Sequence, residues 1–109
     1  MSWVYLIKEE NNEEGNDVRY KIGVTSSEPV KRLKKLQTGN PSRLSFMCLY
    51  KTDYPFRLEK MMHDHYKDKN IINEWYSLDL SDVSGFYRLC EKKSMIIESL
   101  RDNPFSRLK

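Results

Sequence analysis

Two residues in the middle of the chain, Glu59 and His63, have the types and the spacing needed for metal-assisted phosphate chemistry. They stand four positions apart, so on a helix their side chains share one face. A single carboxylate can hold Mg²⁺ or Mn²⁺ when substrate phosphate and waters complete the octahedron. The imidazole could assist proton transfer or orient a water or a phosphate oxygen. The alternative is an exposed glutamate with an ordinary histidine; zinc is disfavoured because no cysteine or second cluster accompanies His63 and His65.

A proton acceptor could come from two β-prone runs near the start of the chain, which contain Tyr5 and the pair Tyr20 and Lys21. A tyrosine hydroxyl or a lysine amine can accept a proton from a nucleophilic water when its pKa is lowered. A nearby cation or metal lowers a tyrosine pKa by favouring the deprotonated form. The alternative is that these tyrosines simply pack, since tyrosine is common in strands.

Gly23 lies in the second of these runs, two positions after Lys21. A glycine in a strand marks a bulge or a place where another backbone or a ligand comes close; the simpler interpretation is an exit turn. Strand alternation puts Lys21 and Gly23 on one face and Tyr20 and Ile22 on the other. We therefore expect Lys21 to point into a cleft, with Gly23 leaving room there for a phosphate or a packed helix, and Tyr20 to pack.

The charge distribution predicts a polyanionic partner. The net charge is +3, but the window from Pro29 to Thr52 contains six cations and no acid. Such a patch is the electrostatic footprint of a nucleic-acid surface, although a solvated helix face would look similar. A guanidinium in this window could hold a phosphate through two parallel hydrogen bonds. The six cations are Lys31, Arg32, Lys34, Lys35, Arg43 and Lys51.

Periodicity and breakers predict the order strand, strand, helix, strand, helix, short extended segment, helix. In the first helix, Ser27 is the expected cap and Val30 the start of the buried stripe; His65 is expected on the buried stripe of the second helix, and Ser81 is the expected cap of the last. This order predicts a small α/β (α+β) domain with a mainly antiparallel sheet and helices packed on it. The predicted strands are 3–8, 18–24 and 43–51, the loop 10–17, the helices within 25–41, 54–69 and 82–101, and the extended segment 72–80.

The length of 109 residues fits one domain. No stretch approaches the roughly 18 apolar residues of a membrane span, and the N-terminus lacks a signal-peptide pattern. The two cysteines lie among apolar residues and in no metal-ligand spacing, which indicates reduced thiols. We expect an intracellular protein, in the cytoplasm or in the nucleus of a eukaryotic host.

Taken together, the segments VYLI, KIGVT, KRLKKLQTGNP, EKMMHDHYKD and EWYSL resemble the GIY-YIG endonuclease superfamily. They are similar in particular to its short phage- and virus-type branch, in which the second motif reads K-I-G. The order and spacing of the motifs and the LQTGNP segment carry the resemblance, which covers residues 3–78. It implies a three-stranded antiparallel sheet flanked by helices, with 1–80 as the nuclease domain and 81–109 as a C-terminal helix packed on the same domain, ending in a frayed tail.

The resemblance also implies the activity: hydrolysis of DNA phosphodiester bonds by an activated water with one Mg²⁺ or Mn²⁺ ion. Trp3 replaces the glycine of the first motif and the family's late asparagine has no clear counterpart, so a catalytically inactive DNA-binding module is the alternative, and a protein-interaction domain is a third. DNA is the expected partner, and the chain is expected to be a monomer or a transient homodimer. The resemblance implies that Tyr5 is the catalytic tyrosine and the first choice of general base, and that Lys21, which replaces the second tyrosine, is the rival candidate for the base. It implies that Arg32 steadies the phosphate charge, that Glu59 binds the metal and that His63 assists. Gly23 is the expected cleft residue, and the expected DNA-binding cations are Lys31, Lys34, Lys35 and Arg43.

Overall fold

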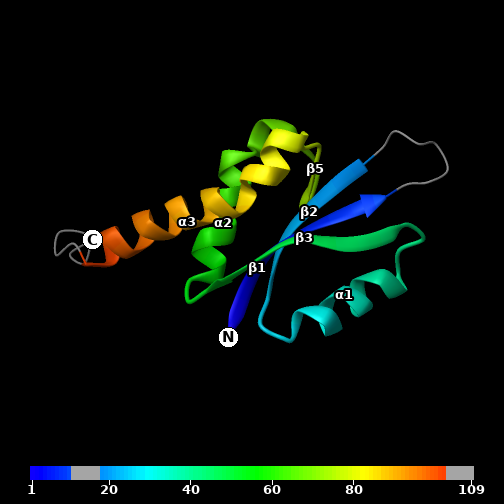
Figure 1. The fold of residues 1–109 in the computed structure, drawn as a ribbon, viewed down its shortest axis with the longest axis horizontal. Coiled ribbons are helices and arrows are strands. Elements are labelled where there is room, and N and C mark those ends of the chain that lie inside the picture. Colours follow the sequence, from blue (N-terminus) through cyan, green and yellow to red (C-terminus); the bar gives the residue numbers. More distant parts are fainter. Residues whose placement is uncertain (11–17, 103–109) are drawn as a thin grey trace.

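The computed structural model describes residues 1–10 and 18–102 of the chain. Its centre is an antiparallel sheet in the order β3-β1-β2-β5-β4 (Figure 1). The long strands arise from the predicted β-prone runs, and two short strands extend the sheet beyond β2. The strands are β1 (Ser2–Glu10), β2 (Val18–Thr25), β3 (Arg43–Thr52), β4 (Asn70–Ile72) and β5 (Trp75–Tyr76).

The α+β class and the antiparallel sheet are confirmed, but the sheet has five strands rather than three. The segment 72–80, expected as one extended piece, instead contains the last residue of β4, a turn and β5, and its final residue begins α3. The reversal occurs at Asn73, whose φ of 49° lies in the left-handed region that asparagine tolerates better than most residues. β5 then pairs with β2 through Tyr20 opposite Tyr76 and Lys21 opposite Trp75.

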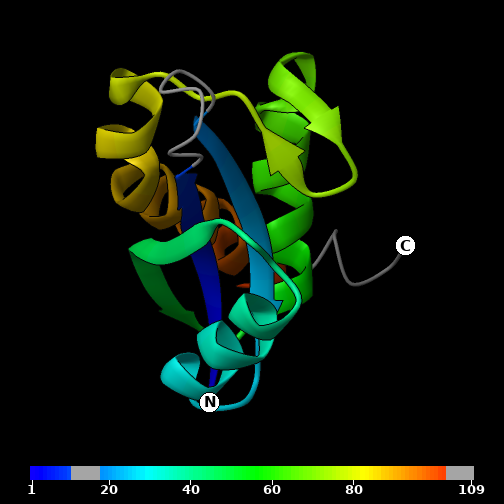
Figure 2. The same ribbon diagram turned by 90° about the vertical axis from the view of Figure 1, so that its right-hand side faces the viewer.

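Helices cover both faces of the sheet (Figures 1 and 2). One face carries α1 (Pro29–Thr38), and the opposite face carries α2 (Pro55–His65) and α3 (Leu80–Asp102). A short 3₁₀ helix, η1 (Lys67–Lys69), follows α2, so the predicted second helix ends earlier than expected. No helix in the described part of the chain has the length and apolarity to cross a membrane.

The two predicted serine caps are wrong. α1 begins at Pro29 after Glu28, with no side-chain cap, and Ser81 lies inside α3. Asp79 caps α3 instead: its Oδ1 accepts from the Asp82 backbone N–H at 2.8 Å, and Asp82 Oδ2 accepts from the Asp79 N–H at 3.1 Å. This reciprocal pair is a capping box with aspartate at both positions, and aspartate caps a helix as well as serine does.

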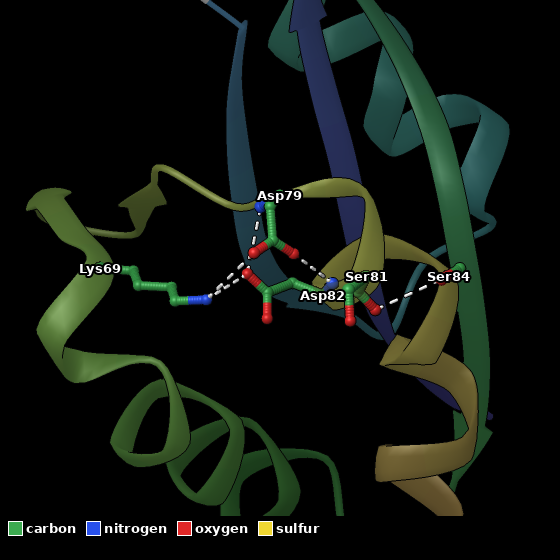
Figure 3. A network of polar contacts seen from close by, with 5 residues as sticks. All are labelled: Lys69, Asp79, Ser81, Asp82 and Ser84. Carbon is green, nitrogen blue, oxygen red and sulfur yellow. Dashed lines mark hydrogen bonds and ion pairs between the residues drawn. The ribbon is translucent and has the colours of Figure 1, made fainter.

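The cap of α3 is joined to η1 by one lysine (Figure 3). Lys69 Nζ lies 2.5 Å from Asp82 Oδ2 and 3.8 Å from Asp79 Oδ2. These contacts hold the start of α3 against the segment that leads into β4 and β5. The predicted loop 10–17 and the predicted frayed tail fall almost wholly on residues 11–17 and 103–109, which lie outside the described residues.

Alternation along β1 divides the core between the two faces. Val4 and Leu6 belong to the larger cluster, with Leu58 and Met62 of α2 and parts of α3. Tyr5 and Ile7 belong to a smaller cluster, beneath Leu33 and Leu36 of α1. Val30 and His65, both expected in the core, are exposed, so those predictions are wrong.

Glu9 is a buried carboxylate that connects α1 to the sheet. Arg19 Nε donates to its Oε1 at 2.8 Å and Asn40 Nδ2 donates to its Oε2 at 2.9 Å. Burial alone would raise the pKa of Glu9, but these two hydrogen bonds and the Arg19 charge lower the pKa below its ordinary value of 4.5. The folded state therefore favours the ionised form of Glu9.

Glu9→Gln is expected to lower the free energy of unfolding at pH 7 by about 1.5–3 kcal/mol, the usual worth of hydrogen bonds to a charged group. Because the folded-state pKa is depressed, this stability is present above the unfolded pKa and is lost as the pH falls through the folded pKa. Urea denaturation at pH 7 and in acid measures both effects. Glu10→Gln, at the half-exposed neighbouring position, loses only a surface ion pair with Lys8, so it is the control and should change stability far less. Equal stability of Glu9→Gln and wild type at pH 7 would contradict the assignment.

Candidate active site

The site begins with a cross-strand pair in the sheet, Tyr5 of β1 opposite Gly23 of β2. Tyr5 is only 1% exposed. A Cβ at position 23 would lie 2.5 Å from Tyr5 Cζ and 2.9 Å from Cε1, closer than real Cβ atoms approach. The room left by Gly23, expected for a phosphate or a helix, is therefore filled by the Tyr5 ring. Gly23 lets the tyrosine lie flat across β2.

Arg32 comes from α1, and its guanidinium lies near enough to the Tyr5 hydroxyl to lower the pKa of that group. Its Nε is buried and has no hydrogen-bond partner among the described residues. A buried donor without a partner is costly, and a ligand oxygen would satisfy it. Sequence periodicity could not separate Arg32 from the other cations of α1, but its contact with Tyr5 does.

The pKa of Tyr5 is raised by its burial, against an opposing effect of Arg32, whose hydrogen bond and charge lower it. The charges of Glu74 and Glu59 raise the Tyr5 pKa further. Glu74 and Glu59 are thus near enough to the Tyr5 hydroxyl to act on its charge.

Glu59 and His63 lie one turn apart on α2 and face each other, with His63 Nε2 at 3.7 Å from Glu59 Oε2. Their side chains are 18% and 22% exposed, so both are accessible from one side only. The other ring nitrogen of His63, Nδ1, is hydrogen-bonded to the hydroxyl of Tyr76 on β5. Burial raises the pKa of Tyr76, and the charges of Glu74 and Glu59 raise it further. Tyr76 is therefore a neutral hydroxyl that fixes the orientation of the imidazole.

Glu74 is the functional candidate that the sequence did not indicate. One ligand atom each from Glu59, His63 and Glu74 lie within 4.8 Å of one another. Glu74 directly precedes β5, and its carbonyl accepts a hydrogen bond from the Ile22 N–H of β2 at 3.1 Å. Its role depends on the pairing of β5 with β2, which no local pattern predicted.

Lys21 is placed on the site face, and Tyr20 is buried in the larger core on the opposite face, as alternation predicted. Lys21 Nζ lies 3.5 Å from Glu74 Oε2 and 5.4 Å from the centre of the Trp75 ring. Its ammonium group thus lies beside the Glu74 carboxylate. This is the arrangement of a group that stabilises charge.

The donor set suits one divalent cation. Two carboxylates and an imidazole provide the oxygen and nitrogen atoms that Mg²⁺, Mn²⁺ and related ions accept in proteins. Structural zinc sites use four protein ligands, commonly with cysteine, and neither free cysteine is part of this cluster. The residues present therefore fit the expected Mg²⁺ or Mn²⁺ ion.

The remaining predicted site residues lie on the surface. Lys31, Lys34 and Lys35 are exposed on α1, the helix that supplies Arg32, and Arg43 is exposed at the start of β3. Lys31 also lies 4.0 Å from Glu28. The structure places these four cations where a polyanion could reach them, and it brings the other predicted residues together around Tyr5 and Glu59.

Comparison with known families gives one result. Residues 2–91 match the family model of the T5orf172 domain. That domain is phage-associated and belongs to a group related to the GIY-YIG and HNH-like endonucleases. No curated protein and no solved structure matches the chain significantly.

Proposed function

We propose that this chain, which belongs to the T5orf172 domain family, is a divalent-metal-dependent endonuclease that hydrolyses DNA phosphodiester bonds. In this proposal it resembles the K-I-G branch of the GIY-YIG enzymes and acts inside the cell as a monomer or a transient homodimer. One observation carries the proposal: Arg32 of α1 and Glu59 of α2 both lie near enough to the Tyr5 hydroxyl of β1 to change its pKa, and Glu59 has His63 and Glu74 within ligand distance. These groups are a proton acceptor, a fixed cation and a metal ligand, the parts of metal-assisted phosphodiester hydrolysis.

Glu59 would hold the divalent ion, which acts when bound as a Lewis acid on the phosphate oxygens. Arg32 supplies the second positive charge. Its guanidinium cannot lose its proton, and its buried Nε–H has no partner among the described residues, so it would donate to a phosphate oxygen that displaced the groups covering it. Because charge on the phosphate grows in the transition state, a pre-positioned donor of this kind accelerates the reaction more than it strengthens ground-state binding.

Tyr5 is the better candidate for the general base. Lys21 is ion-paired with Glu74 and is thus placed to stabilise charge. Burial raises the Tyr5 pKa, so its phenolate is a minor species at neutral pH, while the neighbouring Arg32 favours it. The phenolate fraction therefore rises with pH below that pKa. His63, held by Tyr76, lies beside Glu59 and is placed to assist at the metal.

Plasmid nicking tests this proposal. Wild type is expected to nick supercoiled DNA with Mg²⁺ or Mn²⁺ and to fail with EDTA. Tyr5→Phe removes one oxygen atom and is expected to lower the rate about 10²–10⁴-fold, the usual worth of an acid–base group. The wild-type rate should rise with pH between neutral and mildly alkaline conditions, and the residual rate of the variant should not.

Tyr87→Phe is the matched control, because Tyr87 lies exposed on α3 and packs against Tyr50. A Tyr5→Phe variant that cuts like wild type would remove Tyr5 from the mechanism. A wild type that binds plasmid but leaves it intact with every metal would favour the alternative, an inactive DNA-binding module. The exposed cations of α1 support that alternative, and its binding should weaken steeply with salt.

A further inference from the structure

We infer that Glu74 is a second protein carboxylate of the metal site, so that Glu59, His63 and Glu74 together bind one Mn²⁺-like ion before any DNA arrives. The inference rests on the proposed function only for the place of the ion at Glu59. It adds two protein ligands to the single carboxylate that the sequence suggested, and it specifies the class of ion.

The geometry needs little adjustment. Candidate ligand atoms of the three side chains already lie within 4.8 Å of one another. Two ligands on opposite sides of an octahedral ion, with bonds of about 2.1 Å, are about 4.2 Å apart. Adjacent ligands are closer, about 3.0 Å apart, so side-chain movements of about 1–2 Å would place all three on one ion. The main chain at Glu74 is held by the hydrogen bond from Ile22, so its carboxylate is presented by the sheet.

The charges of the cluster also call for a cation. Two carboxylates this close repel each other, and the repulsion is relieved by a positive charge between them. Lys21 approaches the Glu74 end at 3.5 Å, while Glu59 has His63 as its neighbour at 3.7 Å. A divalent ion would neutralise both carboxylates at once, which Lys21 alone does not.

Tyr76 prepares His63 for this role. With its proton on Nδ1, the imidazole donates to the Tyr76 hydroxyl oxygen and leaves the Nε2 lone pair directed toward Glu59. A hydrogen bond to the distal nitrogen is the arrangement that orients histidine ligands in metal sites. Imidazole nitrogen also favours first-row transition ions over Mg²⁺. The cluster is therefore expected to prefer Mn²⁺ to Mg²⁺ when no phosphate is present.

Calorimetric titration of the full chain with MnCl₂ or MgCl₂, without DNA, tests the inference. Wild type is expected to bind one Mn²⁺ per chain, and more tightly than Mg²⁺. Glu74→Gln should weaken Mn²⁺ binding by at least about tenfold, the lower limit seen even when residues behind the ligands are changed. His63→Gln should reduce the preference for Mn²⁺. The matched control, Glu91→Gln, removes an exposed carboxylate from α3 and should bind as wild type does.

Thermal unfolding of each metal-free variant establishes that it is folded before titration. Equal Mn²⁺ affinity for Glu74→Gln and wild type would overturn the inference, and so would an absence of Mn²⁺ binding without DNA. These outcomes are separable from failure of the proposed function. A chain that binds Mn²⁺ through Glu74 but never cuts DNA would refute the nuclease and keep the site. If the wild type cuts DNA but Glu74→Gln binds Mn²⁺ normally, the proposed nuclease stands and the inference about Glu74 is wrong.

Discussion

Glu59→Gln is expected to reduce plasmid cleavage to the level of the EDTA control, a loss of at least about 10³-fold. Removing a single electrostatic donor from an active site costs about 10²–10³-fold in rate, and Glu59 is expected to hold an entire divalent charge. The substitution keeps the size of the side chain, removes its charge and replaces one accepting oxygen by a donating amide nitrogen. Nicking with Mg²⁺ and Mn²⁺ over a range of metal concentrations is the measurement.

Stability should change little in Glu59→Gln. The partner of Glu59 is His63 at 3.7 Å, and a partly accessible pair of this kind contributes about 1 kcal/mol or less. Glu91→Gln again serves as the control. If Glu59→Gln cuts at the wild-type rate while remaining folded, Glu59 does not hold the ion and the nuclease mechanism is wrong. Partial recovery at high metal concentration would fit a site that retains His63 and Glu74.

Gly23→Ala is expected to lower the cleavage rate by about 10²-fold or more, because displacing a catalytic group by about an ångström costs that much. The added methyl would overlap the end of the Tyr5 ring, so the tyrosine must move away from Arg32. The strain should also reduce the free energy of unfolding by about 1–3 kcal/mol, as overpacking does elsewhere. Cleavage kinetics and urea denaturation measure the two effects.

Gly85→Ala is the control, because the same substitution there should cause no clash. A Cβ at Gly85 meets nothing within 4 Å, and the residue lies within α3. This variant should gain about 0.5–1 kcal/mol from the better helix propensity of alanine and should cut normally. Combining Gly23→Ala with Tyr5→Leu should restore part of the lost stability without restoring activity, because the two side chains share one space. Simple addition of the two destabilisations would argue against the proposed clash.

Local patterns predicted the three long strands and the three α-helices, because each depends on short-range periodicity. Alternation along β2 also placed Lys21 and Gly23 on one face and Tyr20 on the other. It did not reveal why position 23 is glycine. That reason is Tyr5, eighteen positions earlier, and it depends on the register of β1 against β2.

Glu74 was missed for a similar reason. Nothing around it in the sequence distinguishes it from a surface acid, and its meeting with Glu59 requires that β5 pair with β2 and that α2 lie beside that strand. Arg32 was selected by resemblance, since its neighbours Lys31 and Lys34 have the same charge. The burial of its Nε and its closeness to Tyr5 depend on tertiary structure, which helix periodicity does not predict.

The attachment of β5 to the sheet has a consequence for motion. β5 pairs with β2 through two residue pairs only, and the preceding residues, from Asn70 to Asn73, are all exposed. Segments with so few buried contacts open locally at a lower free energy than central strands. Amide hydrogens around Glu74 should therefore exchange with solvent sooner than those around Tyr5 on central β1. The site would then consist of a rigid half that positions the reacting groups and a looser half whose carboxylate can leave and return without unfolding the rest.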